Sequence, residues 1–554
     1  MGELINAALM KEMIVTAASY LDQNKQTIND LNVFPVPDGD TGTNMLMTIM
    51  SSAREVSAID DGSSVGSVLK AMSSGALRGA RGNSGVILSQ LFRGFPNAVK
   101  EDTSEITTKD FAAAIAAGVE SAYKAVMRPR EGTILTVARS MAEASTQIAE
   151  NESDFKPFLE QVISQAEETL QRTPDLLPVL KEAGVVDAGG AGLLTIFTGF
   201  LMALTGTKIE TNLVFSKPKQ VIKPVKASAK DDISTANIEF GYCSEFFIKN
   251  FKPGIKDKDI DVLRKKLADF GDSLVMVGDT EFLKVHVHSN NPGVVLQYAL
   301  ELGDLSDIKI ENMREQHTEL KWSEVEDEEI PAQEYTKDVC IVAVVAGKGL
   351  ADILTDLDVD GIVPGGQSMN PSSEDIRKIV DSVPSGEVIV LPNNKNVILA
   401  AQQAQELTDK KIHVIPSKSF PQGLAAVLAF KPDADIEGNV SSMTEAISEV
   451  KSAEITRAVR DSHINGEDIL KDEILGICEG DIIAHTPDLF ETLTSLLDQM
   501  VTDDDSVISL FAGENVDEDM KSAVSSFIEE RYSDCDVECY DGLQPVYDFI
   551  ISVE

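Results

Sequence analysis

The first 205 residues carry an almost unbroken series of helical hydrophobic patterns. Apolar residues recur at three- and four-residue spacing between residues 3 and 30, and similar patterns follow at 45–54, 65–76, 86–98, 108–127, 133–148, 156–171, 177–183 and 190–205. This spacing places apolar side chains on one face of a helix. The pattern predicts an N-terminal all-α bundle or barrel of about eight helices, whose functional residues come from loops and helix ends at one mouth.

We assign residues 1–207 to this bundle, and the pattern changes four times after it. A lysine- and proline-bearing tract at 208–235 predicts a linker. Mixed strand and helix patterns at 236–325 predict a small α+β middle domain, and the acidic segment 326–335 predicts a second linker. At 336–554 short apolar runs alternate with helical patterns, which predicts an α/β C-terminal domain with a largely parallel sheet.

Charge and composition narrow the functional classes. The formal net charge of −43 argues against nucleic acid or an anionic membrane surface as a partner, because both attract positive charge. The most apolar run, Leu193 to Leu204, is shorter than the ~20 residues of a membrane span. Five cysteines and an N-terminus without a signal-peptide pattern indicate a reduced, cytoplasmic protein.

The segment 32–45 is the most distinctive stretch of the chain, because it holds two carboxylates, two prolines and two glycines. Asp38 and Asp40 therefore lie two residues apart on a shaped loop, an arrangement that suits Mg²⁺ and, through it, phosphate oxygens. A solvated Asp-Gly turn is the alternative. An EF-hand is excluded because the twelfth position from Asp38 is Ile49, and the chain contains no P-loop motif.

Hydroxyl, amide and backbone donors follow at the start of several predicted helices, where anions are favoured. Each such loop alone also fits ordinary turn and capping chemistry. The candidates are Thr41, Thr43 and Asn44 before the helix at 45; Asn83, Ser84 and Gly85 in the glycine-rich turn 79–85; Arg128 and Thr133 in 127–133; and Asp187 and Gly189 in 186–192.

Together these motifs resemble a known family. Pro37-Asp-Gly-Asp-Thr-Gly42 with Asn44-Met45, Gly82-Asn-Ser-Gly85, Glu131-Gly-Thr133 and Asp187-Ala-Gly189 are similar to the nucleotide-binding L-type domain of dihydroxyacetone kinases. With the downstream domains, the whole chain resembles the catalytic subunit of bacterial fatty acid kinases.

The resemblance implies ATP and Mg²⁺ as cofactors, with Asp38 and Asp40 as catalytic metal ligands. It implies that the segments around Thr43 and Ser84 contact phosphates and that Asp187 lies against the nucleotide. Dihydroxyacetone kinases carry a third aspartate shortly before this pair, whereas here the nearest polar side chain is Asn32, at a slightly different spacing. Asn32 is therefore a further candidate.

The middle domain contains Lys284-Val-His-Val-His-Ser289, in which His286 and His288 face the same side of a predicted strand. With Cys243 on another predicted strand they suggest a Zn²⁺ site, and buried or interfacial histidines are the alternative. The family resemblance supports the zinc interpretation, because the middle domain of these subunits carries a matching Cys and His-x-His.

The resemblance implies a kinase that phosphorylates the carboxylate of a fatty acid bound to a separate fatty-acid-binding protein, and that yields acyl phosphate for phospholipid synthesis. It also implies a homodimer. Two alternatives remain open: a kinase of small polyols such as dihydroxyacetone, and a nucleotide-sensing scaffold without turnover. The polar C-terminal loops 365–372, 392–396 and 416–423 fit partner docking, small-ligand binding or simple capped turns.

Overall fold

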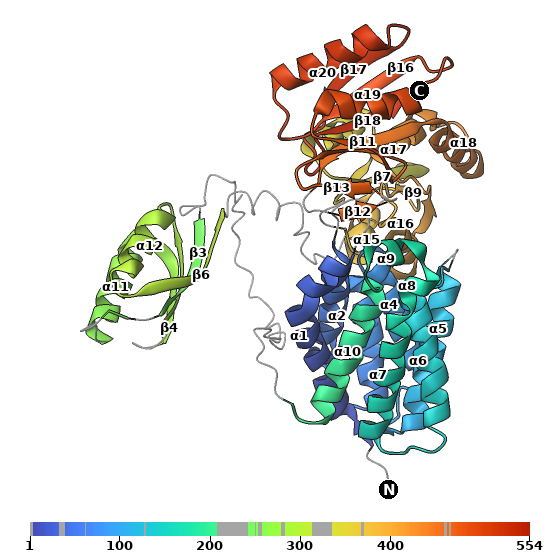
Figure 1. The fold of residues 1–554 in the computed structure, drawn as a ribbon. Helices are drawn as coiled ribbons and strands as arrows, with labels where there is room; N and C mark the ends of the chain where they lie inside the picture. Colours follow the sequence, from blue (N-terminus) through green and yellow to red (C-terminus); the bar gives the residue numbers. More distant parts are fainter. Residues whose placement is uncertain are drawn as a thin grey trace. The chain divides into compact units, whose positions relative to one another are not determined.

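The computed structural model describes residues 4–32, 39–60, 62–126, 129–207, 242–249, 251–252, 257–278, 283–312, 335–366, 370–458, 462–464 and 467–554. The chain divides into two compact units. One unit combines residues 1–219 with 330–554, and the other is residues 220–329 (Figure 1).

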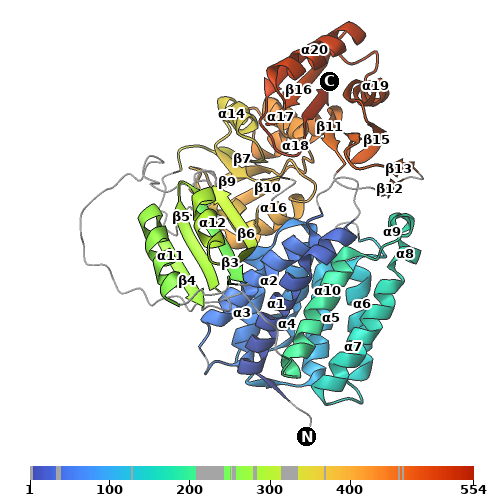
Figure 2. The same ribbon diagram turned by 60° about the vertical axis from the view of Figure 1, so that its left-hand side comes forward.

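The N-terminal part is an all-α barrel, as the hydrophobic pattern predicts. Each long helix packs against the next, and α1 also packs against α10, so that the ring closes (Figure 2). A short antiparallel strand pair, β1 (Ile5–Asn6) with β2 (Glu105–Ile106), connects the chain just before α1 with the chain just before α5. The helices are α1 (Ala7–Leu31), α2 (Thr41–Ala58), α3 (Val65–Gly79), α4 (Gly82–Ala98), α5 (Thr108–Ala125), α6 (Ile134–Ile148), α7 (Phe155–Gln171), the short α8 (Thr173–Leu176) and α9 (Pro178–Ala183), and α10 (Ala188–Leu204).

Phe111 on α5 lies at the centre of an aromatic cluster in the barrel core. Its ring makes edge-to-face contacts with five other phenylalanines, at centroid distances of 5.4 to 6.5 Å. These rings come from α4, α7 and α10 and are almost completely buried. Such contacts add to the apolar burial that holds helices together, so this cluster stabilises the packing of α4, α5, α7 and α10.

The middle unit is α+β, as predicted. Its strands form an antiparallel sheet in the order β4-β5-β3-β6, with apolar residues of both helices packed against one face. The sequence pattern misses β6. The elements are β3 (Tyr242–Lys249), α11 (Asp257–Phe270), β4 (Gly271–Gly278), β5 (Leu283–Ser289), α12 (Pro292–Leu300) and β6 (Asp304–Asn312).

The C-terminal part begins with a wholly parallel sheet in the order β10-β9-β7-β8. Strand β7 is buried on both faces, which explains its continuous apolar run. The elements are β7 (Val339–Val345), α14 (Lys348–Asp356), β8 (Gly361–Pro364), α15 (Ser373–Ser382), β9 (Glu387–Leu391), α16 (Ile398–Ala404), the 3₁₀ turn η2 (Gln405–Leu407), β10 (Lys411–Val414), α17 (Phe420–Ala429) and α18 (Ile436–Glu449).

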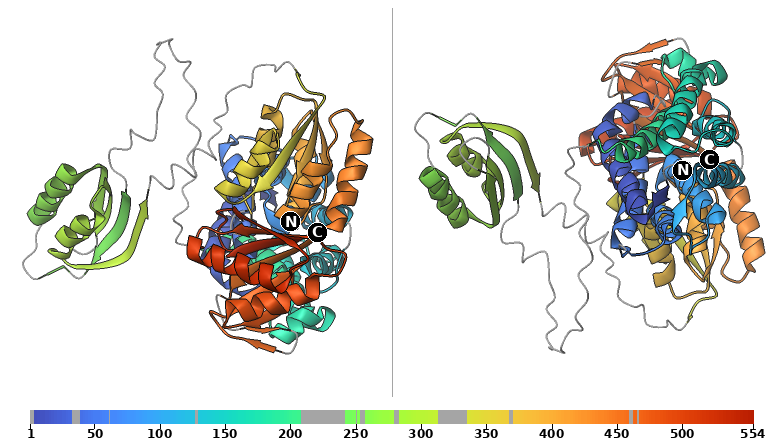
Figure 3. Two further views of the ribbon diagram at one scale, coloured as in Figure 1. Left: turned by 90° about the horizontal axis from the view of Figure 1, so that it is seen from above. Right: turned by 90° about the horizontal axis from the view of Figure 1, so that it is seen from below.

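A second sheet follows in the order β15-β14-β11-β18-β16-β17, and within it only β16 and β17 pair in parallel. This part of the chain has the orange and red colours in Figure 3. The expectation of a largely parallel sheet is therefore wrong for this half. One reason is the two-residue turn Glu479-Gly480, where both φ angles are positive (51° and 93°), the geometry of a tight antiparallel hairpin. The elements are β11 (Lys451–Arg457), the hairpin β12 (Ser462–Ile464) and β13 (Glu467–Ile469), β14 (Ile474–Cys478), β15 (Asp481–Thr486), α19 (Leu489–Met500), β16 (Val507–Ala512), α20 (Glu518–Arg531), β17 (Asp536–Asp541) and β18 (Phe549–Val553).

The barrel and the parallel sheet share one hydrophobic cluster. Ala80 and Val86, at the α3–α4 connection, belong to the same buried cluster as Val342 of β7 and Val380 of α15. Polar contacts extend this interface, because Gln403 donates to the carbonyl of Leu77 at 3.1 Å and bonds the Ser89 hydroxyl. The barrel end at α4 is therefore packed against the C-terminal part.

Candidate nucleotide-binding site

Four of the described barrel helices, α2, α4, α6 and α10, begin at the same end of the barrel. At these helix starts, glycines allow neighbouring helices to pack so closely that there is no room for a Cβ. A Cβ on Gly82 of α4 would lie 2.5 Å from Asn44 Nδ2 of α2, and one on Gly192 of α10 would lie 2.5 Å from Met45 Sδ. Each helix start carries the positive end of the helix dipole, and four such ends at one mouth favour anions such as phosphate.

Helix α2 begins at Thr41, four residues earlier than the sequence predicts. The reason is a contact with α1: Asn29 Oδ1 accepts from the N–H of Thr43 at 3.2 Å, and Asn29 Nδ2 donates to the Thr43 hydroxyl at 3.0 Å. Thr41, Thr43 and Asn44 therefore lie in the first helical turn and not in a loop. Sequence reasoning missed Asn29, although Asn is a common helix-capping residue.

Asp40 is the residue that precedes α2, and its side chain makes no capping bond to the helix. Instead, its Oδ2 accepts a hydrogen bond from Asn370 Nδ2 at 2.6 Å. The carboxylate is partly buried at the mouth. A carboxylate held beside helix N-termini can bind a hard cation that accompanies phosphate.

The segment 79–85, predicted as a glycine-rich turn, is helical from Gly82 onward. Gly82 has φ +55°, which lets α4 begin directly after Arg81. Asn83, Ser84 and Gly85 therefore lie in the first turn of α4. Gly85 is packed tightly against α2, since a Cβ there would lie 2.4 Å from Thr48 Oγ1.

Asp187 caps α10, because its Oδ2 accepts from the N–H of Gly190 at 2.6 Å, while its own N–H donates to Thr173 Oγ1 at 3.1 Å. Burial raises the pKa of Asp187 to about 6, and the N–H groups of Gly190 and of Ile134 on α6 act in the opposite direction. The carboxylate of Asp187 thus accepts from N–H groups in the first turns of both α6 and α10.

Thr133 and Gly189 lie beside Asp187. Thr133 is the residue that precedes α6, and its hydroxyl donates to the carbonyl of Arg130 at 2.8 Å instead of capping the helix. A Cβ on Gly189 would lie 3.1 Å from the Cβ of Ile134. Small residues here let the two helix starts approach each other closely.

The C-terminal part reaches this mouth through two of the polar loops noted in the sequence. Asn370 contacts Asp40, and Asn396 Oδ1 accepts from Asn83 Nδ2 at 3.1 Å. Arg81 donates to the carbonyl of Asn370 at 2.9 Å and pairs with Asp375 at 3.0 Å. Arg81, Asn370 and Asn396 were not among the sequence candidates, because their proximity depends on residues about 300 positions apart.

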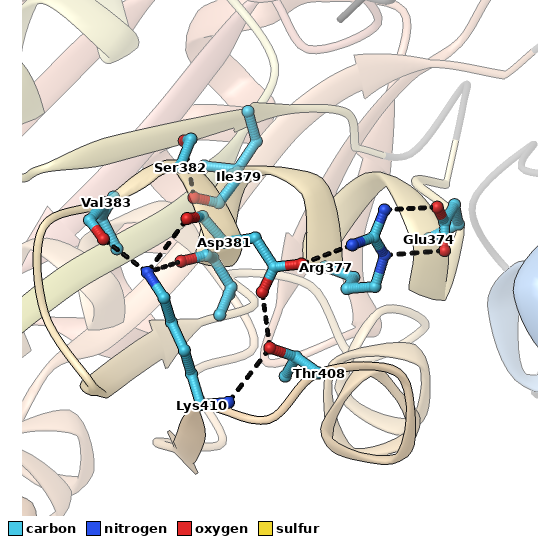
Figure 4. Close-up of polar contacts among 9 residues, drawn as sticks. Glu374, Arg377, Ile379, Asp381, Ser382, Val383, Thr408 and Lys410 are labelled. Carbon is cyan, nitrogen blue, oxygen red and sulfur yellow. Dashed lines mark hydrogen bonds and ion pairs between the residues drawn. The ribbon is translucent and has the colours of Figure 1, made fainter. Parts of the chain in front are cut away.

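Helix α15, which follows the Asn370 loop, is fixed at both ends. Ser372 and Asp375 form a capping box at its start. At its end the ammonium of Lys410 donates to the carbonyls of Val380 at 2.9 Å, Asp381 at 3.0 Å and Val383 (Figure 4). The loop that contacts Asp40 is therefore anchored on a rigid helix.

Residues of all three polar loops of the parallel sheet also line a cavity of about 110 Å³ between the two C-terminal sheets. Lys395, Ser419 and Glu454 are among its lining residues. Burial raises the pKa of Glu454 to about 7, repulsion from Glu479 adds to this, and Lys395 acts in the opposite direction.

Three sequence candidates do not lie on the described helix starts of the mouth. Asp38 and Arg128 lie outside the described residues, so their roles remain predictions. Asn32 directly follows α1, and its N–H donates to the carbonyl of Asn29 at 3.1 Å. The structure brings together Asp40, Thr41, Thr43, Asn44, Asn83, Ser84, Gly85, Thr133, Asp187 and Gly189 at the mouth.

The predicted zinc ligands lie on neighbouring strands of the middle unit. Cys243 on β3 pairs in register with His288 on β5, and Glu245 pairs with His286. The structure describes the backbone of Cys243, His286 and His288 but not their side chains, so the zinc site stays a prediction. Within the described ranges no three His, Cys, Asp or Glu side chains gather as a metal-binding group. None of the described helices combines the length and apolar character of a membrane span.

Known families match almost the entire chain. Residues 35–202 match the DAK2 domain, residues 239–320 match the FakA-like middle domain of fatty acid kinases, and residues 340–554 match the FakA-like C-terminal domain. The chain is 45% identical over 546 residues to protein YloV of Bacillus subtilis, covering 98% of each chain. It is 42% identical over 550 residues to the uncharacterized protein SAR1202 of Staphylococcus aureus, covering 99% of each.

Two solved structures that align with part of the chain show a weak likeness to it. The Streptococcus pneumoniae fatty acid kinase B3 protein loaded with linoleic acid aligns with a TM-score of 0.29 and 13% identity, over 39% of this chain and 99% of that one. The dihydroxyacetone kinase of C. freundii in complex with AMP-PNP and Mg²⁺ aligns with a TM-score of 0.30 and 10% identity, over 39% and 48%. From the family matches and the full-length relatives, we conclude that this chain belongs to the FakA-like family of fatty acid kinase proteins.

Proposed function

We propose that this chain is the ATP-dependent catalytic subunit of a fatty acid kinase, which phosphorylates the carboxylate of a fatty acid bound to a separate fatty-acid-binding protein. Membership of the family supports a kinase. The observation that carries the proposal is the mouth itself, where four helix N-termini converge beside the carboxylate of Asp40. In a protein with a net charge of −43, such a concentration of positive helix-dipole ends is suited to phosphate.

In this proposal Asp38 and Asp40 hold Mg²⁺, and their oxygen ligands fit a hard cation. Bound Mg²⁺ would neutralise charge on the nucleotide phosphates. Thr41, Thr43 and Asn44 on α2 and Asn83, Ser84 and Gly85 on α4 would orient the phosphates through N–H and hydroxyl groups. Arg128, Thr133, Asp187 and Gly189 would complete the nucleotide side of the mouth, with Asn32 near the metal loop.

The proposed reaction transfers one phosphoryl group. An oxygen of the fatty acid carboxylate forms a bond to the γ-phosphorus, the bond from that phosphorus to the β,γ-bridging oxygen breaks, and ADP leaves. The products are acyl phosphate and ADP. Such a transfer depends on positioning and on charge stabilisation more than on covalent chemistry by the protein.

Trapping of acyl phosphate tests this proposal. The purified protein is incubated with ATP, Mg²⁺, a fatty acid and candidate fatty-acid-binding proteins, and hydroxylamine converts acyl phosphate to a hydroxamate. We expect hydroxamate only when the chain and a binding protein are both present. Phosphorylation of dihydroxyacetone without a partner would support a small-polyol kinase instead, and nucleotide binding without ATP consumption would support a scaffold.

A homodimer also remains part of the proposal, on the family resemblance alone. Light scattering coupled to size-exclusion chromatography measures the mass directly. A mass of the single 59.8 kDa chain at micromolar concentration would contradict it.

A further inference from the structure

Asn370 is a buried polar residue that the proposed reaction leaves without a role. Its side chain is 2% exposed. Its Nδ2 donates to Asp40 Oδ2 at 2.6 Å, while its Oδ1 is buried and has no hydrogen-bond partner within the described part of the chain. A buried acceptor without a partner is unfavourable, so this oxygen is suited to a donor that is supplied by a ligand or water.

Residues from both sides of the interface hold Asn370 in place. Arg81 donates to the backbone carbonyl of Asn370 at 2.9 Å and is itself fixed by Asp375 at 3.0 Å. Gly82 lies beside the amide, since a Cβ there would be 3.4 Å from Asn370 Nδ2. The donor that faces Asp40 is therefore preorganised and is not a mobile surface side chain.

We infer that Asn370 is a positioning residue for the metal-binding carboxylate of Asp40, so that the C-terminal part completes the nucleotide site of the barrel. This inference rests on the proposed function. A carboxylate that binds a cation with one oxygen is oriented by a hydrogen bond to the other, and such supporting partners typically matter 10–100-fold for metal affinity. The buried Oδ1 adds an acceptor of the kind that a water of a hydrated Mg²⁺ requires.

An inhibitory role of Asn370 would change Mg²⁺ binding in the opposite direction. If the Asn370 amide merely occupied the oxygen that the cation needs, its removal would strengthen binding of Mg²⁺ together with nucleotide. If Asn370 orients Asp40, its removal weakens that binding. The two roles therefore differ in the direction of one measured quantity.

The test is calorimetric titration of the full-length protein with a non-hydrolysable ATP analogue over a series of Mg²⁺ concentrations. Asn370→Leu keeps the branched shape and removes both the donor and the acceptor. Glu406→Gln is the matched control, because it weakens the Arg93–Glu406 ion pair, which lies at the same interface and is exposed. Each variant is also titrated without Mg²⁺.

We expect Asn370→Leu to require about 10–100-fold more Mg²⁺ for half-maximal binding, with unchanged metal-free binding, and Glu406→Gln to match the wild type. An unchanged or lower Mg²⁺ requirement in Asn370→Leu would overturn the inference. Loss of metal-free binding in this variant would also overturn it, because the residue would then support the fold of the site. A wild type that shows no Mg²⁺-dependent nucleotide binding would instead refute the proposed function.

Discussion

Asn370 and Asp40 are 330 residues apart in the chain, yet the amide of one donates to the carboxylate of the other at 2.6 Å. This contact makes the C-terminal part a wall of the barrel mouth. It also places a C-terminal side chain on one of the two carboxylates that the sequence singles out, so the two parts of this unit need to be considered as one site.

Substitution of the predicted metal ligands should remove turnover without loss of the fold. We expect Asp38→Ala and Asp40→Asn each to lower ATP consumption on the order of 100-fold or more, because neither side chain could then balance cation charge. Asn at position 40 can still accept from Asn370, so the melting temperature should stay close to that of the wild type. Full activity in either variant would remove its metal role.

Gly82 should be more sensitive to a methyl group than another glycine with the same backbone conformation. Both Gly82 (φ +55°) and Gly184 (φ +67°) are left-handed, so alanine costs about 1–2 kcal/mol at each from backbone strain. At Gly82 the added Cβ also meets Asn44 Nδ2 at 2.5 Å, whereas at Gly184 no atom of the described residues beyond its two chain neighbours lies within 4 Å of the added Cβ.

Urea unfolding measures this difference. Gly82→Ala should lose on the order of 1 kcal/mol more than Gly184→Ala, since overpacking adds to the strain. Equal losses would show that the α2–α4 contact relaxes freely.

Asp187 should matter for both stability and nucleotide binding. Asp187→Ala removes the α10 cap and should cost about 1 kcal/mol. Asp435 provides the control, because it caps α18 with a similar bond to Gly438 at 2.7 Å and lies in the C-terminal part. Asp435→Ala should lose similar stability and keep nucleotide affinity. If Asp187→Ala also kept its affinity in calorimetry, Asp187 would be a structural cap only.

Lys410 should be a stabilising residue of the C-terminal part. Its ammonium donates to three carbonyls at the end of α15, and burial lowers its pKa (Figure 4). Lys410→Met leaves these carbonyls without that donor, and we expect a loss of about 1–3 kcal/mol. The neighbouring Lys411 pairs with Glu387 at the surface, so Lys411→Met should change the free energy of unfolding by less than about 0.5 kcal/mol. Chemical denaturation measures both variants, and an equal loss of unfolding free energy in Lys410→Met and Lys411→Met would contradict this prediction.

Glu454 should make stability depend on pH. Its pKa is raised from 4.5 to about 7 in the folded protein, so between these values the folded state binds more protons than the unfolded state. Stability therefore falls as pH rises from about 4.5 to 7, and the full penalty is present above pH 7.

Glu454→Gln should remove this slope and raise the free energy of unfolding above pH 7, by on the order of 1–3 kcal/mol. Denaturation at pH 5 and pH 8 measures both effects. A variant with the same pH slope as the wild type would show that another group titrates.

Local features of this protein can be predicted from its amino-acid sequence alone. Apolar spacing predicts the barrel helices, the α+β character of the middle unit and the alternation of the parallel sheet, because a helix or strand shows its period in neighbouring residues. The motifs around Asp40, Ser84 and Asp187 are also visible, since each occupies a few consecutive positions.

Tertiary contacts set where the helices begin and what meets at their starts. The contact of Asn29 with Thr43 moves the start of α2 to Thr41, and the left-handed Gly82 moves the start of α4 into the predicted turn. Local periodicity carries no signal for such contacts. The hydrogen bond between Asn370 and Asp40 could not be predicted from the sequence, because it requires the barrel and the C-terminal sheet to pack around a shared core.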